Sequence, residues 1–276
     1  MLYLVATPIG NLGDLSARAI ETLRAVDCIY CEDTRHTGLL LQHFDIQKPT
    51  RSLHTHNERE RTEEVVEALK SGREIAYVSD AGMPGVSDPG AMLVDACYRE
   101  GLPCTVIPGA SAVPIAAVLS GLPAQPFSFF GFLPRESKPR REMLDAIAGV
   151  RHQVILYESP HRVQATLRDL LDRFGDGPAA VLRELTKKYE TVERGTLSAL
   201  VERFSDEPKG ECVICFVPSA KEEAEAPDLD ALLCELLETE SVKDAAAIAA
   251  ERLRLPKKTV YKRALELKNR KSEENA

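Results

Sequence analysis

The sequence has no tryptophan, and aromatic residues make up only 5% of its 276 residues. So few aromatic side chains argue against a platform on which the bases of single-stranded nucleic acid would stack. Long apolar runs are also missing, since none approaches the ~18–20 residues that a membrane-spanning helix needs. The first basic residue is Arg18, so the basic segment of a secretory signal is absent, and we expect a cytoplasmic protein without membrane association.

Positive charge is in short supply: 35 lysines and arginines stand against 43 aspartates and glutamates, which gives a formal net charge of −8. Such an acidic chain is not suited to hold nucleic acid over its whole surface. The hydrophobic content of 44% and the charged content of 28% are those of globular proteins, which excludes a disordered or collagen-like chain. The length allows about two domains.

Cysteine occurs in an odd number, seven, which fits reduced thiols rather than a disulfide framework. Two pairs have the Cys-x-x-Cys spacing of zinc and redox sites, Cys28 with Cys31 and Cys212 with Cys215. Both pairs lie in short β-branched, apolar runs that predict strands. Residues i and i+3 of a strand point to opposite faces, so we expect buried cysteines and no metal site.

The first 120 residues alternate between apolar strand runs and amphipathic helix runs. Strands are predicted near residues 2–6, 27–31, 74–79 and 104–107, and helices near 17–26, 58–71, 91–100 and 111–120. Ser16 is the expected N-cap of the first helix, and Gly72 is placed to end the second. This alternation predicts an N-terminal α/β domain, residues 1–120, whose parallel sheet is covered by helices on both faces.

Beyond a proline-rich break at residues 121–126 the pattern changes. Strands are predicted near residues 127–132, 153–157, 179–184, 189–196 and 211–217, and helices near 141–147 and 160–174. Little helix is expected between the last three strands. This order predicts a second α/β domain with a mixed sheet, residues 121–220.

The end of the chain, residues 228–270, predicts a helical tail that follows an acidic linker at Lys221–Pro227. Helices are expected near 229–238, 242–252 and 257–268, with Pro256 at the start of the last one. A short helix, a tight turn and a basic second helix resemble a helix-turn-helix. The expected phosphate contacts are Lys257, Lys258, Lys262 and Arg263, and the alternative for this tail is a solvated helical cap or a dimer element.

Three loops follow predicted strands of the first domain, at the end where doubly wound sheets bind ligands. They are residues 6–14 (ATPIGNLGD), 79–90 (SDAGMPGVSDPG) and 107–112 (IPGASA). None contains the GxGxxG or GxxxxGK[ST] pattern of ordinary nucleotide loops. Glycines allow the backbone to approach a ligand closely, and Asp80 and Asp88 supply carboxylates. A plain strand-to-helix turn is the alternative for the first loop.

Titratable groups gather at other strand ends. Residues 33–36 (DTRH) follow the second strand, and His54 and His56 would share one strand face, although no third metal ligand accompanies them. In the second domain, residues 157–162 (YESPHR) and 183–187 (RELTK) place charged groups at strand ends. Each segment taken alone could be a salt-bridged loop. Together they predict a polar wall that faces the first domain.

The segments TPIGNLGD, CEDTRHT, SDAGMPGVSDPG, IPGASA, FFGFLP, YESPHR and RELTKKYE, in this order along residues 6–190, resemble the ribosomal RNA small subunit methyltransferase I family, a branch of the tetrapyrrole methylases. The tail fits that family's C-terminal extension, so the resemblance covers nearly the whole chain. Met83 stands where the family more often has threonine, and the tail after Lys268 is short.

This resemblance implies two α/β domains with S-adenosylmethionine between them, and a homodimer. It implies 2′-O-methylation of a cytidine ribose in the decoding region of 16S ribosomal RNA, within the small ribosomal subunit. No metal is required, since the cofactor already carries an activated methyl group.

The site residues follow from the same resemblance. Cofactor binding is expected at Pro8, Leu12, Asp80, Met83, Ser111, Ala112 and Tyr157. By their chemistry, the candidates for proton acceptor are Asp33, His54, Glu158 and Glu184. Arg35 and Lys187 are suited to a phosphate or to a developing alkoxide.

Two other functions fit parts of the sequence. A methyltransferase that acts on small tetrapyrroles would share the fold, but it has no use for a basic helical tail. A non-catalytic RNA-binding protein on the same scaffold would not need glycines and prolines in every cofactor loop. We therefore expect an rRNA methyltransferase.

Overall fold

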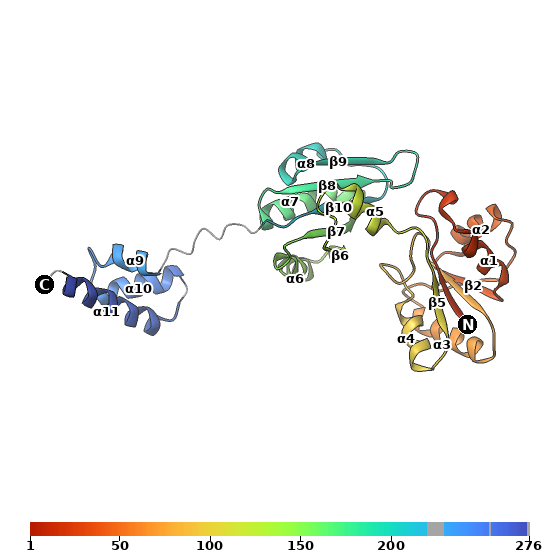
Figure 1. Cartoon of the computed structure of the whole chain (residues 1–276), viewed down its shortest axis with the longest axis horizontal. Coiled ribbons are helices and arrows are strands. Elements are labelled where there is room, and N and C mark those ends of the chain that lie inside the picture. The colour runs from red at the N-terminus through yellow and green to blue at the C-terminus, as the bar shows by residue number, and fades with distance from the viewer. Residues whose placement is uncertain (220–228, 254, 275–276) are drawn as a thin grey trace. The chain divides into compact units, whose positions relative to one another are not determined.

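A computed structural model describes residues 1–219, 229–253 and 255–274. The chain divides into two compact units, Met1–Ser219 and Ala220–Ala276, and each is described by itself. Figure 1 labels the helices and strands of both units. The acidic linker predicted at Lys221–Pro227 lies outside the described residues.

The first sheet is parallel throughout, in the order β3-β2-β4-β1-β5. In chain order its strands are β1 (Leu2–Val5), β2 (Cys28–Cys31), β3 (Thr50–Ser52), β4 (Ile75–Val78) and β5 (Cys104–Ile107). The three central strands are almost entirely buried, as expected when helices cover both faces of a sheet.

Helices pack on both faces of the first sheet. On one face lie α1 (Ala17–Ala25) and α2 (Thr34–His43), and on the other lie α3 (Glu58–Lys70) and α4 (Ala91–Arg99). The hydroxyl of Ser16 accepts the N–H of Ala19 at 3.1 Å and so caps α1, as the sequence predicts. The expected parallel sheet with two covered faces is confirmed.

The second sheet is mixed, in the order β6-β7-β10-β8-β9. Its strands are β6 (Phe127–Phe132), β7 (Gln153–Glu158), β8 (Pro178–Arg183), β9 (Thr191–Thr196) and β10 (Cys212–Phe216). Only β6 and β7 pair in parallel; the other neighbours are antiparallel. The predicted mixed sheet is therefore confirmed.

Helices also cover this sheet on both faces. On one face lie α6 (Ser137–Ala148), α7 (Val163–Phe174), which follows the short turn η2 (Pro160–Arg162), and α8 (Leu197–Arg203). On the other lies α5 (Ala112–Leu119), which follows the edge strand β5 of the first sheet. Because α5 leaves one sheet and packs on the other, the loop before it lies between the two sheets.

Three elements differ from the expectations. Helix α2 and strand β3 were not expected, and α8 adds helix where little was predicted. The expectation that His54 and His56 share a strand face is wrong. Both lie in the turn between β3 and α3, where the Asn57 side chain accepts the backbone N–H of His54 at 2.8 Å and holds a turn instead of a strand.

The cysteine pairs lie as the strand periodicity predicts. Cys28 belongs to the core beneath α3 and α4, whereas Cys31 belongs to the core on the opposite face. Cys212 and Cys215 are likewise divided between the two faces of the second sheet. Neither pair can chelate one ion in this arrangement.

The C-terminal unit consists of α9 (Leu229–Leu236), α10 (Val242–Leu253) and α11 (Lys257–Glu274) around a small core. Ser241 caps α10, since its hydroxyl accepts the N–H of Asp244 at 3.2 Å. Pro256 immediately precedes α11. Across the part of the chain that the structure describes, every helix is too short or too polar to span a bilayer.

Candidate functional site

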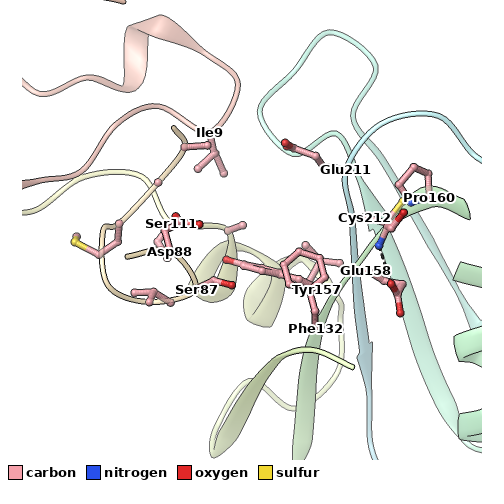
Figure 2. A pocket seen from close by; sticks show the side chains of 17 residues that line it. Ile9, Ser87, Asp88, Ser111, Phe132, Tyr157, Glu158, Pro160, Glu211 and Cys212 are labelled. Carbon is pink, nitrogen blue, oxygen red and sulfur yellow. Dashed lines mark hydrogen bonds between the residues drawn. The ribbon is translucent and has the colours of Figure 1, made fainter. Parts of the chain in front are cut away.

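A pocket of about 350 Å³ lies where the loops of the first sheet face the second sheet (Figure 2). The first domain supplies Ile9, Ala81, Gly82, Met83, Val86, Ser87, Asp88, Ser111 and Ala112, and the second supplies Phe132, Tyr157, Glu158, Ser159, Pro160, Glu211, Cys212 and Val213. The volume suits a small-molecule ligand or cofactor. The pocket also lies at the carboxyl ends of parallel strands, where α/β folds bind ligands.

Gly82 brings the loop after β4 against the loop after β1. Its φ is +82°, a left-handed value that favours glycine, and a Cβ at this position would lie 3.2 Å from Cγ2 of Ile9. The backbones of Thr7 and Gly82 are joined by two hydrogen bonds of 2.9 and 3.1 Å. This wall of the pocket is therefore backbone that is held in place by its neighbouring loop.

Four of the predicted cofactor residues line the pocket: Met83, Ser111, Ala112 and Tyr157. The other three, Pro8, Leu12 and Asp80, do not belong to its wall. Pro8 precedes the lining residue Ile9, and Leu12 is exposed in the short turn η1 (Leu12–Asp14). The carboxylate of Asp80 accepts the backbone N–H of Asp33 at 3.2 Å and so links the loops after β4 and β2.

Tyr157 forms much of the opposite wall. Its ring packs edge-on against Phe129 and Phe132, with centroid separations of 4.7 and 5.6 Å. Burial raises the pKa of Tyr157 to about 12, with smaller contributions from Asp88 and Glu211. The phenol therefore stays neutral at physiological pH and can donate a hydrogen bond to a ligand.

Glu158 is the one predicted catalytic residue that lines the pocket, but its carboxylate is already bonded. It accepts the N–H of Ser159 at 2.8 Å (a dashed line in Figure 2) and the hydroxyl of Thr166 at 2.6 Å. Arg162 lies 3.5 Å away, and the Glu158 side chain is fully buried. These contacts occupy the oxygens that a proton acceptor would use.

Asp33 and Arg35 lie at the start of α2, outside the pocket wall. The carboxylate of Asp33 accepts the N–H of Arg35 at 2.8 Å, and the Arg35 guanidinium at 3.1 and 2.7 Å. These contacts hold the pKa of Asp33 well below its usual range. Asp33 is therefore a weak base, and Arg35 is an exposed cation whose charge is shared with it.

His54 also lies outside the pocket wall, in the turn before α3. Its Nδ1 is buried and has no hydrogen-bond partner among the described residues.

Lys187 and Glu184 lie in the loop after β8. The Lys187 ammonium is 2.8 Å from the Glu184 carboxylate and 2.9 Å from that of Glu211, which lines the pocket. The hydrogen bond from Lys187 lowers the pKa of Glu184. The Lys187 side chain also packs against Gly10, so this ion-paired loop meets the loop after β1.

The prediction missed Glu32, which directly follows β2. Its Oε1 is buried and has no hydrogen-bond partner among the described residues. Burial, reinforced by the charges of Asp88 and Asp80, raises the pKa of Glu32 to about 7. Burial also raises the pKa of Asp88, which lines the pocket. The signal available in the sequence was a carboxylate directly after a wholly apolar strand.

Two family models match the chain. Residues 1–201 match the family described as "Tetrapyrrole (Corrin/Porphyrin) Methylases", and residues 223–268 match the "RsmI C-terminal HTH domain".

Curated relatives carry the name "Ribosomal RNA small subunit methyltransferase I". The relative from Synechocystis sp. is 45% identical over 97% of this chain and 98% of its own length. The relative from Vibrio cholerae is 45% identical over 96% of this chain and 94% of its own length.

Solved structures resemble the chain in fold. A "diphthine synthase" superposes with a TM-score of 0.63 at 19% identity, over 79% of this chain and 90% of that one. A uroporphyrin-III C-methyltransferase from Thermus thermophilus, complexed with S-adenosylhomocysteine, superposes with a TM-score of 0.56 at 18% identity, over 78% and 96%.

Proposed function

The chain belongs to the ribosomal RNA small subunit methyltransferase I family, within the tetrapyrrole methylases, and on this premise we propose that it methylates the 2′-hydroxyl of a cytidine in the decoding region of 16S ribosomal RNA. The observation that carries the proposal is the pocket, whose walls are the glycine-containing loop after β4, the start of α5 and Tyr157. We propose that the protein acts in the cytoplasm, on the small ribosomal subunit.

The pocket residues fit S-adenosylmethionine, the methyl donor that we propose. The absence of a side chain at Gly82 leaves space in which the cofactor can approach the backbone. Ser111 directly precedes the N-terminus of α5, whose backbone N–H groups can bind a carboxylate of the cofactor. The neutral phenol of Tyr157 can donate a hydrogen bond to the cofactor. The fold is also that of the methyltransferase whose structure contains S-adenosylhomocysteine. When bound, the cofactor supplies a methyl group on a sulfonium sulfur, which keeps the bonding electron pair as the hydroxyl oxygen takes the methyl.

The chain's own residues would align that hydroxyl, exclude water and accept its proton. We propose that Met83, Ser111, Ala112 and Tyr157 contact the cofactor directly. Pro8, Leu12 and Asp80 would support the loops around it.

The predicted catalytic residues divide in the same way. Glu158, Asp33 and Lys187 are held in hydrogen bonds and ion pairs, which suits them to fix the shape of the site. Arg35 is exposed and suited to contact RNA phosphate. His54 stays a candidate proton acceptor.

We propose a homodimer that forms through the open edge of the first sheet. Val106 on β5 is exposed, although it lies on the sheet face that α3 and α4 cover elsewhere. Val94 and Tyr98, one turn apart on α4, are also exposed. A second copy of the chain could cover these apolar side chains, and sedimentation of the wild type beside a Val106→Asp variant would test this.

The decisive experiment incubates the purified protein with labelled S-adenosylmethionine and unmodified small ribosomal subunits, and then maps the modified nucleotide. The expected product is one 2′-O-methylcytidine in the decoding region. It should form equally well when the enzyme alone has been exhaustively chelated before mixing, because no metal takes part in the transfer and the magnesium that folds the RNA is kept. Label on the base instead of the ribose would contradict the proposed reaction. Label on a small tetrapyrrole and none on RNA would favour the tetrapyrrole alternative.

A further inference from the structure

Phe132 lies at the rim of the pocket. Its side chain lines the pocket and packs edge-on against Tyr157, with the ring centroids 5.6 Å apart (Figure 2). Even so, 51% of Phe132 is exposed to solvent. A large apolar side chain that belongs to a pocket and is half in water marks the place where the pocket opens. A substrate too large to enter the pocket whole would lie against this ring.

A basic segment follows this ring in the chain. Residues 133–141 (LPRESKPRR) contain one anion, Glu136, and four cations: Arg135, Lys138, Arg140 and Arg141. The whole chain has a net charge of −8, so such a segment stands out. Arg135 and Arg141 are exposed, and neither forms an ion pair with a residue that the structure describes. Their two guanidinium groups are therefore available to an external anion.

Two largely buried arginines hold the start of this segment against the pocket wall. The guanidinium of Arg162 donates to the carbonyl of Leu133 at 2.8 Å and lies 3.5 Å from the pocket residue Glu158. The guanidinium of Arg140 donates to the Thr166 hydroxyl at 2.9 Å, and this hydroxyl donates to Glu158 at 2.6 Å. Two short chains of contacts thus fix the segment, so a partner bound there would need to order little of it.

Phe132, Arg135 and Arg141, which we call the rim surface, combine the groups that bind RNA. A guanidinium group binds phosphate through two parallel hydrogen bonds, and an aromatic ring stacks on a base. An acidic protein repels a polyanion, so it needs a local concentration of positive charge where the two meet. The rim surface supplies that charge on the catalytic unit itself.

We propose that the rim surface binds the RNA strand next to the target nucleotide. Phe132 stacks on a neighbouring base, while Arg135 and Arg141 contact phosphates on the same strand. The inference rests on the proposed function and names the part of the catalytic unit that holds the substrate. This surface is separate from the helical tail, whose lysines belong to the C-terminal unit.

The test measures filter binding of the full chain, without cofactor, to small ribosomal subunits and to protein-free 16S ribosomal RNA. In Arg135→Gln combined with Arg141→Gln, the affinity for both should fall by roughly tenfold. The slope of log K against log salt should flatten by about 1.4–1.8, because two phosphate contacts are lost. Calorimetry should give a cofactor affinity within about twofold of wild type, since neither arginine lines the pocket.

The matched control is Arg73→Gln combined with Arg151→Gln, which removes the same charge. Both arginines are exposed, and neither forms an ion pair with a residue that the structure describes. They precede β4 and β7, so they lie at the ends of these strands that are away from the pocket. The control should bind RNA with nearly wild-type affinity and slope. Equal weakening in the two double variants would show a general effect of net charge and would overturn the proposal.

Phe132→Leu tests the stacking part of the proposal, because it removes the ring and keeps an apolar side chain at the rim. The loss of one stacked base should lower the affinity for protein-free RNA by roughly 5- to 100-fold. Phe132→Tyr keeps the ring and should bind RNA within about threefold of wild type. Equal affinities in the leucine and tyrosine variants would contradict stacking by this residue.

The remaining outcomes separate this inference from the proposed function. If the double arginine variant bound small subunits weakly but protein-free RNA normally, the rim surface would contact a ribosomal protein, and the proposal would be wrong. Wild-type RNA affinity and salt slope in every rim variant, beside normal methylation, would refute this inference and leave the proposed function standing. A wild-type protein that neither binds nor methylates small-subunit RNA would refute both.

Discussion

The two sheets differ in how the buried carboxylates that end or follow their strands are bonded. In the second sheet, Glu158 accepts a hydrogen bond from Thr166, and Glu184 is paired with Lys187. At the strand ends of the first sheet, Glu32 and Tyr77 bury polar atoms that have no hydrogen-bond partner among the described residues. Matched groups make a stable wall, whereas unmatched buried groups cost stability and suit a site where a ligand completes them. We infer that the bonded carboxylates of the second sheet support the shape of the pocket.

Gly82→Val should disrupt the part of the pocket wall that the first sheet supplies, and it should have the largest effect on cofactor binding. Valine is strained at a φ of +82°, and its side chain would meet Ile9 and intrude on the pocket wall. We expect the affinity for S-adenosylmethionine to fall by roughly 100-fold because the valine side chain blocks the pocket wall, whereas the backbone strain of about 1–3 kcal/mol lowers the stability of the protein. Isothermal calorimetry measures this directly.

Gly72→Val is the matched control. Gly72 has a similar φ of +85° but nothing within 4 Å of its Cβ position. This variant should melt earlier and bind the cofactor normally. Equal losses of affinity in both variants would show that backbone strain, and not the pocket wall, causes the effect.

Glu158→Ala tests the support given by the second sheet. The change leaves the buried Thr166 hydroxyl without its acceptor and Arg162 without its anion, so we expect the free energy of unfolding to fall by about 3 kcal/mol. Urea unfolding is the measurement. Glu142→Ala, which removes an exposed contact of 4.0 Å to Lys138, should change it by less than about 0.5 kcal/mol. A small loss in Glu158→Ala would contradict the supporting role.

Glu32→Gln should sharpen the comparison, because it should stabilise the protein. The folded-state pKa of Glu32, about 7, lies above its ordinary value of 4.5, so ionisation costs stability as the pH rises through this interval. Glutamine removes that cost. Discounted for partial solvent screening, the gain should be about 1–2 kcal/mol at a pH near 8.5 and close to zero near pH 5. Thermal unfolding of both proteins at the two pH values measures this gain in stability. A gain that does not depend on pH would contradict a raised pKa of Glu32.

The sequence predicted the elements whose signals are local. The Ser16 cap and the buried runs of β2 and β4 all lie as expected. Strand β3 was not predicted because it has only three residues, none of them large and apolar, and only its pairing with β2 defines it as a strand. Helix α8 has only seven residues, too few for its periodicity to stand out.

The candidate site shows the same limit. The loops after β1, β4 and β5 are visible as glycine and proline patterns, but Glu211, Cys212 and Val213 reach the pocket only because β10 lies beside β7. Whether a carboxylate is matched or free also depends on tertiary contacts. Glu158 ends an apolar strand and Glu32 follows one, so the sequence does not distinguish them. The structure shows that the carboxylate of Glu158 accepts the Thr166 hydroxyl, whereas Oε1 of Glu32 has no hydrogen-bond partner among the described residues.

Among its described residues, the C-terminal unit also contains both ion-paired and unpaired charged groups. Of the four cations expected to contact phosphate, Arg263 is held within the unit: its Nε donates to Asp230 at 2.8 Å and its Nη1 to Glu266 at 2.9 Å. Lys257, Lys258 and Lys262 are exposed, and none of them forms an ion pair with a residue that the structure describes. The three lysines therefore suit RNA binding, whereas Arg263 suits the packing of α11 against α9.

Changing the three lysines to glutamine should give the smallest effect, a loss of roughly threefold to tenfold in affinity for ribosomal RNA. Each lost phosphate contact flattens the slope of log K against log salt by about 0.7–0.9, so three contacts should flatten it by about 2 to 3. Arg263→Gln should change the slope by no more than one phosphate contact, and it should lower the melting temperature of the C-terminal unit because it removes the guanidinium that joins α11 to Asp230 on α9. Filter binding at several salt concentrations measures both variants. If the salt dependence of RNA affinity flattened in Arg263→Gln and not in the lysine variant, the prediction would be wrong. Arg263, and not the three lysines, would then contact the RNA phosphates.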